Sequence, residues 1–324
     1  MNSVKCLAVG CSYGLKDSFL GIFLLSNIDN DQKGKAVEGR SSSKHGVRQI
    51  RPDTKRKGKV LPMMAQCCFL NGGVLLLSVM VFERYIVPAV KYIMMMMVGL
   101  FMVGNGPQSS LWSWMEPTMN YIFKYLWVVP LFWLCKILNI FWFVEIADVA
   151  YRKKFGRPVS SLLSSKDSIF KVLSKTMADF VFSINVEVCF LLQAQLVGLI
   201  PIFGPALSFI HMSLLYSLYA FEYTWTNLGW TVVRRLGYIE NNWPYFIGFG
   251  VLLSTLTNLT SSAVISACIF GITFPIFILS GLDARPYEQC DYPVRLFSLA
   301  IWLTNKVFLI KSSGKKLSQT DLSS

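Results

Sequence analysis

The sequence predicts an all-α, polytopic membrane protein, and three observations support this fold class. Hydrophobic residues make up 53% of the 324 residues and only 15% are charged, whereas a soluble domain carries about 25% charge. The mean hydropathy is positive, at +0.48. The apolar residues also gather in stretches close to or above the roughly 20 residues that a helix needs to cross a bilayer. These features exclude disordered, coiled-coil and collagen-like chains.

The expected architecture is two long transmembrane helices, two helical hairpins and amphipathic interfacial helices. We divide the chain into an amphipathic N-terminal helix (1–29), a flexible basic cytoplasmic loop (30–62), a helical membrane domain (63–310) and a cytoplasmic tail (311–324). The loop is rich in Ser, Gly and Gln and poor in large apolar residues, a composition typical of flexible segments.

The N-terminal segment has the pattern of a helix that lies in the membrane plane. On a helical wheel Lys5 and Lys16 share one side, and leucines occupy another, as in amphipathic interfacial helices. Its longest apolar run is too short for a span or a signal peptide. Glycines at positions 10, 14 and 21 weaken the prediction, because glycine destabilises a helix interior.

Two segments carry all of the excess positive charge. The net charge of the chain is +13; residues 33–59 contribute +8 and residues 150–176 contribute +6. Basic residues concentrate in the cytoplasmic loops of membrane proteins, so both segments are expected in the cytoplasm. The 33–59 segment either binds anionic lipid headgroups or an acidic partner, or only determines the topology, and we favour the second interpretation.

The first long apolar stretch, 64–104, is about twice as long as the bilayer is thick. It forms either two spans or one long helix that leaves the membrane near Pro88. A second stretch, 118–150, returns across the bilayer. The connection 105–117 contains no basic residue and therefore suits the non-cytoplasmic side. This favours a single crossing in 64–104.

Two further stretches have the pattern of helical hairpins. Residues 179–223 turn at 198–205, and residues 243–282 turn at 255–262. Each hairpin either crosses the bilayer twice or enters and leaves through one leaflet, which requires packed neighbours around its irregular turn. The apolar segment 292–310 is expected to be interfacial, because a crossing there would place the lysines of the tail on the wrong side.

Three polar residues in the first hairpin are candidates for a functional cluster. If the hairpin folds about residues 201–202, Glu187 lies within about one turn of Tyr216, and His211 is nearby. Ionisable residues inside a membrane often mark proton or ion sites. The alternative, which we favour, is a polar clasp that joins two helices through hydrogen bonds.

No catalytic, cofactor-binding or metal-binding motif is present in the sequence. The spacing of cysteine and histidine does not match a zinc site, and phosphate-binding, dinucleotide-binding and hydrolase motifs are absent. We therefore expect no enzyme activity, no cofactor and no nucleic-acid partner. Cys67 and Cys68 follow the basic loop, where palmitoylation occurs in other proteins, but small buried apolar residues are the simpler interpretation.

Motifs along nearly the whole chain resemble the etoposide-induced protein 2.4 family of endoplasmic reticulum membrane proteins. The matching stretches are Gly14–Ile22, Gln66–Gly73, Trp112–Trp114, Leu126–Phe132, Glu145–Asp148, His211–Tyr219, Phe221–Tyr223, Ile239–Phe246, Gly248–Gly250, Phe274–Pro275 and Arg295–Ser298. The resemblance implies residence in the endoplasmic reticulum membrane and roles in autophagy and in growth suppression or apoptosis. It also implies binding to an anti-apoptotic Bcl-2-type protein.

The same superfamily includes bacterial sulfate permeases, which are similar in architecture. They have two long spans, two hemi-penetrating hairpins and an interfacial helix, which agrees with the pattern inferred from charge and length. An even number of crossings places both termini in the cytosol.

The motif residues also have physical interpretations of their own. Asp148 and Arg152 are four residues apart on a helix and can pair. Trp243 suits the membrane interface, and Pro244 suits the first turn of a helix. All of these roles are structural.

Two more motif residues belong to the first hairpin. Glu222 stands at one end of the connection 224–242, near Arg234 and Arg235, and Tyr219 closes the motif that begins at His211. We expect structural roles for them as well.

The preferred hypothesis is a non-enzymatic endoplasmic reticulum membrane factor that acts in autophagy through partners or by shaping the bilayer. One alternative is an anion channel or transporter that carries sulfate-like ions. Another is a scaffold for an anti-apoptotic Bcl-2-type protein. A transporter should show several polar residues facing a pore, and the sequence offers only scattered ones, namely Glu83, Arg84, Glu187 and His211.

Overall fold

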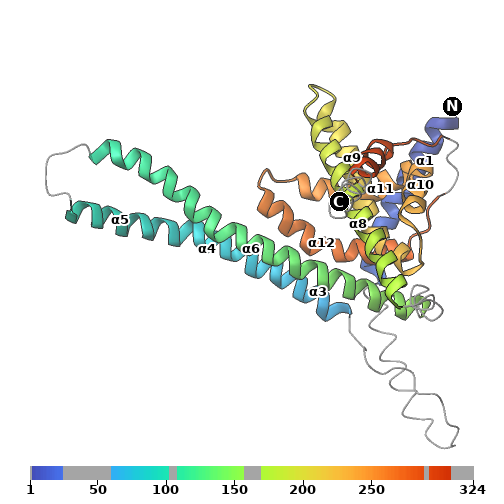
Figure 1. Ribbon diagram of the computed structural model, residues 1–324, viewed down its shortest axis with the longest axis horizontal. Helices are drawn as coiled ribbons and strands as arrows, with labels where there is room; N and C mark the ends of the chain where they lie inside the picture. Colours follow the sequence, from blue (N-terminus) through green and yellow to red (C-terminus); the bar gives the residue numbers. More distant parts are fainter. Residues whose placement is uncertain (1, 25–59, 102–107, 157–168, 288–291, 308–324) are drawn as a thin grey trace, which may run out of the picture. The chain divides into compact units, whose positions relative to one another are not determined.

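The computed structural model describes residues 2–24, 60–101, 108–156, 169–287 and 292–307 (Figure 1). The regular elements within these ranges are helices, and five helical segments are long and apolar enough to cross a membrane. The predicted class of an all-α polytopic membrane protein is therefore confirmed. One of the five segments is Lys5–Leu24, so the expectation that the N-terminal segment is too short for a span is wrong by length and composition. Residues 30–59 of the predicted basic loop and the whole tail lie outside the described residues, whereas 60–62, predicted to belong to the loop, are the start of a helix.

The chain forms two compact units. Unit 1 contains Met1–Val60, Ile146–Leu256 and Phe274–Ser324, and unit 2 contains Leu61–Glu145 and Thr257–Thr273. The predicted second hairpin, residues 243–282, therefore contributes to both units.

In unit 2, the first long apolar stretch is one helical run without a break. It consists of α3 (Val60–Cys68), η1 (Phe69–Leu76), α4 (Leu77–Val81), η2 (Phe82–Ile86) and α5 (Val87–Phe101). The two η segments are π-helical, and the second ends just before Pro88, which lacks the amide hydrogen of a regular turn. The run continues through Pro88 as helix.

The second long helix of unit 2 begins earlier than expected. Helix α6 runs from Gln108 to Phe155, so most of the connection 105–117 is helical. Pro117 and Pro130 lie inside the helix, and membrane helices tolerate such prolines because neighbouring groups satisfy the freed carbonyls. In Figure 1, α6 runs antiparallel to α3, α4 and α5.

A reciprocal amide pair joins these two helical runs. The Nδ2 of Asn71 donates to the Oδ1 of Asn139, and the reverse bond is also formed, both at 2.9 Å. Both side chains are buried. A Cβ on Gly271 of α12 (Ala263–Asp283) would lie 2.5 Å from the Asn71 amide, so only glycine permits this approach. Cys67, one turn before Asn71, is fully buried, in agreement with its apolar interpretation, whereas the adjacent Cys68 is exposed, contrary to the same interpretation.

In unit 1, the first predicted hairpin consists of α8 (Ile169–Gly198) and α9 (Gly204–Asn227). The turn between them includes Ile202, whose φ of 70° is unusual for a β-branched residue. A Cβ on Gly204 would lie 2.7 Å from the carbonyl oxygen of Gly198. Glycine at this position therefore allows the two helices to approach closely at the turn.

The second predicted hairpin consists of α11 (Trp243–Asn258) and α12, and α10 (Val232–Asn241) precedes it. Close backbone approaches hold α11 against α9: a Cβ on Gly250 would lie 1.8 Å from the carbonyl oxygen of Ser213. The core beside this crossing is aromatic. Phe221 makes edge contacts with Phe246 and Phe249, with ring centroids 5.1 and 4.8 Å apart, a favourable arrangement of π-systems.

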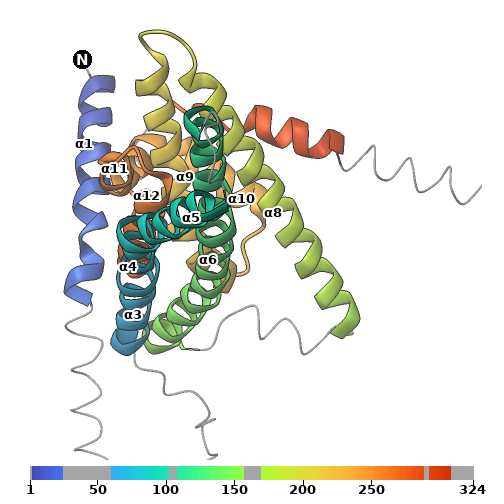
Figure 2. The ribbon, with the colours of Figure 1, turned by 90° about the vertical axis from the view of Figure 1, so that its left-hand side faces the viewer.

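Helix α1 (Asn2–Ser18) packs on α11 through its glycines, and Gly21, just after α1, contacts the unit 1 part of α12 (Figure 2). A Cβ on Gly14 would lie 2.0 Å from the carbonyl oxygen of Tyr245, and one on Gly21 would lie 2.1 Å from that of Ile276. Small residues allow such close contacts between membrane helices. The glycines that we expected to weaken the helix are therefore its contact points, which the amphipathic pattern did not indicate.

Hydrogen bonds complete the docking of α1. The hydroxyl of Tyr245 donates to the Oδ2 of Asp17 at 2.7 Å. The hydroxyl of Ser280 on α12 donates to the carbonyl oxygen of Ser18 at 2.7 Å and accepts the amide of Gly21 at 2.8 Å. Buried polar groups need hydrogen-bond partners, and a shift of α1 along α11 and α12 would break these bonds. They therefore favour one position of α1 in unit 1.

The segment predicted to be interfacial is helical over its described residues 298–307. Phe297 is fully buried and stacks on Phe190 of α8 with ring centroids 4.2 Å apart. Trp302 is exposed and lies under the ammonium of Lys306, an aromatic–basic pair typical of membrane interfaces.

Glu240 of α10 holds the start of this segment. Its Oε1 accepts the amide of Phe297 at 2.9 Å, and its carbonyl oxygen accepts the amide of Val294. Burial raises the pKa of Glu240, and the hydrogen bond from Phe297 and the charge of Arg295 oppose this effect.

Candidate functional site

A largely buried polar cluster of unit 1 lies where α8, α9 and α10 meet. Helix α8 supplies Ser183 and Glu187, which are one turn apart, and the Ser183 hydroxyl contacts the Oε1 of Glu187 at 3.0 Å. Helix α9 supplies Glu222, whose Oε1 lies 2.7 Å from the same hydroxyl. Helix α10 supplies Arg235, whose Nη1 donates to the Oε1 of Glu222 at 2.9 Å. We call these four residues the carboxylate–arginine cluster.

The connection between α9 and α10 aims Arg235 at the cluster. Gly229 has a φ of 74°, a conformation that glycine adopts easily and that commonly ends a helix. The chain then turns so that the carbonyl oxygen of Trp230 accepts two bonds from Arg235, from Nε at 3.0 Å and from Nη2 at 2.8 Å. The neighbouring Arg234 instead lies over the Trp230 ring, 4.1 Å from its centroid.

Arg235 is buried, with 7% of its surface exposed, so its charge depends on protein partners. Burial lowers the pKa of Arg235, and the negative charges of Glu222 and Asp179 oppose this change. Arginine keeps its charge in proteins. The cluster therefore contains a permanent cation, held between the two hairpin helices and the connection that follows them.

The structure does not place Glu187 and His211 in one group of contacts, as the predicted cluster of Glu187, His211 and Tyr216 required. Glu187 contacts Ser183 and Glu222, and both carboxylates interact electrostatically with Tyr219, which is one turn from Tyr216 on α9. The described contacts of His211 belong to a separate group.

His211 joins α9 to α8 and lies near the 292–297 segment. Its Nδ1 lies 2.7 Å from the carbonyl oxygen of Leu207, so this nitrogen carries the hydrogen. Its Nε2 then accepts a bond from the Nε2 of Gln193 at 3.2 Å, and Gln193 also donates to the carbonyl oxygen of Leu296. Phe190 packs beside the imidazole ring. His211 therefore joins the two helices through Gln193, a residue that was not among the candidates predicted from the sequence.

The remaining motif residues have structural contacts. Asp148 and Arg152 form the expected ion pair on α6, at 3.9 Å. Helix α11 begins at Trp243, whose indole nitrogen donates to the carbonyl oxygen of Tyr292 at 2.9 Å. The carbonyl oxygen of Pro244 accepts the thiol of Cys11 on α1.

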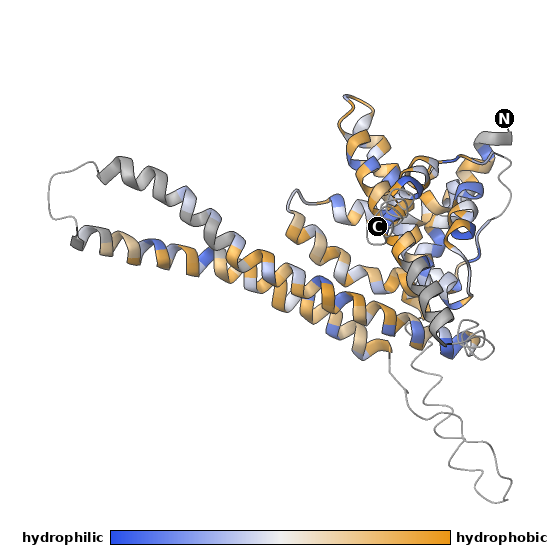
Figure 3. Cartoon of the chain, in the orientation of Figure 1, coloured by the Kyte–Doolittle hydropathy of each residue, from blue (hydrophilic) through white to orange (hydrophobic). Residues whose placement is uncertain are grey.

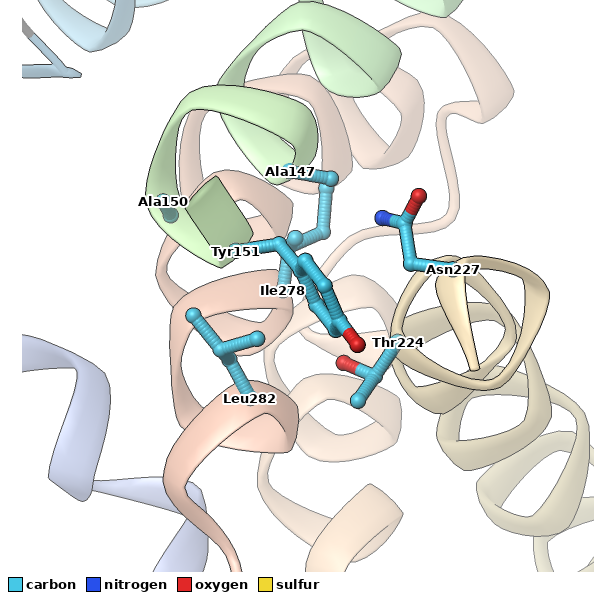
Figure 4. A pocket seen from close by; sticks show the side chains of 7 residues that line it. All are labelled: Ala147, Ala150, Tyr151, Thr224, Asn227, Ile278 and Leu282. Carbon is cyan, nitrogen blue, oxygen red and sulfur yellow. The ribbon is translucent and has the colours of Figure 1, made fainter. Parts of the chain in front are cut away.

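A crevice in unit 1 lies between the end of α6, α9 and α12 (Figure 4). Tyr151, Thr224 and Asn227 line it together with apolar residues. The space between these side chains is too narrow for a water molecule. We therefore do not assign a ligand to it.

The sequence pattern pointed to part of the carboxylate–arginine cluster only. Glu187 was a candidate, and Glu222 was expected near Arg234 and Arg235, but nothing connected these two observations. The Ser183–Glu187 spacing of four residues was the available signal, because such residues share one face of a helix. The choice of Arg235 over Arg234 required the tertiary structure.

Comparison with known proteins identifies the family. The model of the family "Sulfate transporter CysZ/Etoposide-induced protein 2.4" matches residues 48–282 of this chain. This range includes all four residues of the carboxylate–arginine cluster. No solved structure matches the chain significantly.

Curated relatives agree with this match. "Protein EI24 homolog" from Arabidopsis thaliana is 28% identical over 261 residues, which cover 76% of this chain and 81% of the relative. "Ectopic P granules protein 4" from Caenorhabditis elegans is 26% identical over 297 residues, which cover 86% and 84%. "Protein EI24 homolog" from Dictyostelium discoideum is 25% identical over 251 residues, which cover 76% and 71%. The protein is therefore a multi-pass membrane protein that belongs to the Sulfate transporter CysZ/Etoposide-induced protein 2.4 family.

Proposed function

We propose that this protein is a non-enzymatic membrane factor of the endoplasmic reticulum that acts in autophagosome formation or maturation, and in growth suppression or apoptosis. The family match and the curated relatives support a role of this kind. The motifs that resemble the endoplasmic reticulum family cover nearly the whole chain. Both termini are proposed to lie in the cytosol, in agreement with the two basic segments.

The observation that carries the mechanism is the apolar turn of the α8–α9 hairpin. Four large apolar side chains at this turn are exposed: Leu199 by 79%, Ile200 by 47%, Ile202 by 87% and Phe203 by 69%. Residues 188–210 contain no charged residue, and apolar residues are frequent along the described helices of both units (Figure 3). Burying one such side chain in an apolar medium contributes about 1.5–3 kcal/mol. We propose that this turn inserts into the bilayer and displaces lipid there.

Charging the turn should therefore abolish function. In the double variant I202D/F203D, two carboxylates must enter the bilayer, at a cost of up to about 3 kcal/mol each. We expect that cells depleted of the protein recover autophagic flux with the wild-type chain and not with this variant. The measurement is the turnover of a lipidated autophagosome marker, with and without a lysosomal inhibitor.

A matched control is the variant L228D/V233D, which charges two exposed apolar residues at the α9–α10 connection and should restore flux. Normal flux in depleted cells would remove the proposed role in autophagy. Full rescue by I202D/F203D would leave that role in place and show that insertion of the turn is not its mechanism.

Anion transport is the second candidate, because the family description includes a sulfate transporter. The described structure favours it less, since the buried Arg235 is already bound to Glu222 and Trp230. Liposomes that contain the purified protein should accordingly retain trapped sulfate as long as empty liposomes do. Rapid release that depends on the protein would favour transport.

Contacts with partners form the remaining part of the proposal. We propose that residues 33–59 contact anionic headgroups, and that a Bcl-2-type or autophagy protein binds the cytosolic face. Residues 30–59 are the segment to delete in tests of these contacts. A deletion of residues 1–60 would also remove α1 and the residues just after it, which pack into unit 1 through Gly14 and Gly21.

A further inference from the structure

The hydrogen bonds of the carboxylate–arginine cluster cannot all form if both of its carboxyl groups are ionised. The Ser183 hydroxyl lies within bonding distance of both Glu187 and Glu222, but it has a single hydrogen to donate. The two carboxyl groups also interact with each other electrostatically, and the hydroxyl can donate to only one of them. An ionised carboxylate only accepts hydrogen bonds, so one member of this pair must carry a proton.

The charges around the pair indicate which member carries it. Arg235 forms its charged bond with Glu222 at 2.9 Å, and its other two described bonds go to the carbonyl oxygen of Trp230. The positive charge of Arg235 thereby compensates the negative charge of Glu222, which stays ionised. Glu187 has no bond to a cation among the contacts described for it, and an isolated buried carboxylate is costly.

The other groups around the cluster do not supply a second positive charge. On α8, Asp179 adds a negative charge that acts on Arg235. On α9, Tyr219 and Tyr223 interact with both carboxylates, and their hydroxyl groups are uncharged at neutral pH. On α10, Arg235 is the cation that acts on Glu187.

We propose that Glu187 and Glu222 form a proton-binding site in which one proton, carried on Glu187, is shared with the ionised Glu222. When this proton leaves for the solvent, two negative charges face each other across the contact between α8 and α9. Like charges at such a distance repel strongly in a protein interior. Release of the proton therefore weakens the packing of α8 against α9 beside α10, and proton binding restores it.

Infrared spectroscopy of the full-length protein in lipid nanodiscs tests the site directly. At neutral pH, the spectrum of the wild type minus that of E187Q should show the carbonyl stretch of one protonated carboxylic acid, with the expected shift in D2O. E222Q should lose the same band, because Arg235 then pairs with an ionised Glu187. D148N is the matched control, since it removes a carboxylate from a half-exposed ion pair, and it should keep the band.

A second measurement separates proton binding from a simple structural role. A folded state that binds one more proton than the unfolded state loses stability as the pH rises. The melting temperature of the wild type should therefore fall between neutral and alkaline pH, and the fall should be clearly smaller in E187Q, where the glutamine amide donates permanently to Glu222. An absent band in the wild type, or a band retained in both glutamine variants, overturns the proposal. So does an equal fall in E187Q. If E187Q does not fold, loss of the band when the wild type is titrated to alkaline pH decides the question.

Discussion

Replacing Gly14 by alanine is expected to detach α1 from unit 1 and to lower the melting temperature of the protein strongly. The new Cβ would lie 2.0 Å from the carbonyl oxygen of Tyr245 and 2.7 Å from the amide nitrogen of Phe249. Both atoms belong to the backbone of α11, which cannot move aside as a flexible side chain does. Overpacking of a tight contact costs typically 1–3 kcal/mol, and we expect a loss of about 3 kcal/mol here. Thermal unfolding and hydrogen exchange of the α1 amides provide the measurement.

Gly237→Ala is the matched control for this experiment. Gly237 lies in α10 with no atom within 4 Å of its would-be Cβ, so alanine should stabilise that helix by up to about 1 kcal/mol. The same substitution is thus expected to destabilise the protein at Gly14 and to stabilise it at Gly237. A similar melting temperature for Gly14→Ala and Gly237→Ala would contradict the docking of α1 described above.

The partner glycine on α11 provides an internal test of the same contact. A Cβ on Gly248 would lie 2.1 Å from the carbonyl oxygen of Cys11 on α1. Gly248→Ala should therefore have an effect like that of Gly14→Ala. The double variant should be less destabilised than the sum of the two, because the contact can be lost only once. Full additivity would show that the two glycines act separately.

Replacing Arg235 by methionine is the second substitution for which we expect a large effect. It leaves the partly buried Glu222 without its cation and the carbonyl oxygen of Trp230 without two donors. Removing one partner of a buried ion pair costs about 3–5 kcal/mol. The measurement is the free energy of unfolding in detergent or lipid nanodiscs at neutral pH.

Two further variants make this prediction specific. R152M breaks the Asp148–Arg152 pair, whose side chains are 39% and 55% exposed, and should cost less than about 1 kcal/mol. The double variant R235M/E222Q removes both charges of the buried pair and should recover part of the lost stability, since no buried ion then remains without a partner. Equal losses in R235M and R152M would show that the burial of Arg235 does not matter.

The sequence predicted the helical elements because their signals are local. The low charge, the lengths of the apolar stretches and the glycine and proline residues near 198–205 indicated the long helices and the first hairpin, and the structure has helices there. The start of α6 was missed because Pro117 resembles a helix breaker, whereas prolines are tolerated in membrane helices. The glycines of α1 were misread because a wheel diagram shows which residues share a face but not what lies against that face.

The candidate site shows the same division between local and tertiary information. Folding the hairpin about residues 201–202 placed Glu187 near Tyr216, whereas Glu187 contacts Glu222 further along α9. The register between two helices depends on their crossing and on the reach of their side chains, and neither is encoded in the spacing along one helix. Arg235 comes from a third helix, whose direction is determined by the turn at Gly229.

The sequence alone determined that this protein is helical, membrane-embedded and related to a known family, because hydropathy and family motifs are properties of contiguous residues. The tertiary structure alone determined which glycines are contact points of α1. It also determined that Ser183, Glu187, Glu222 and Arg235 form one cluster. The physical reason is that close helix approach and charge pairing act over a few ångströms between segments far apart in the chain, so they exist only once the helices have packed.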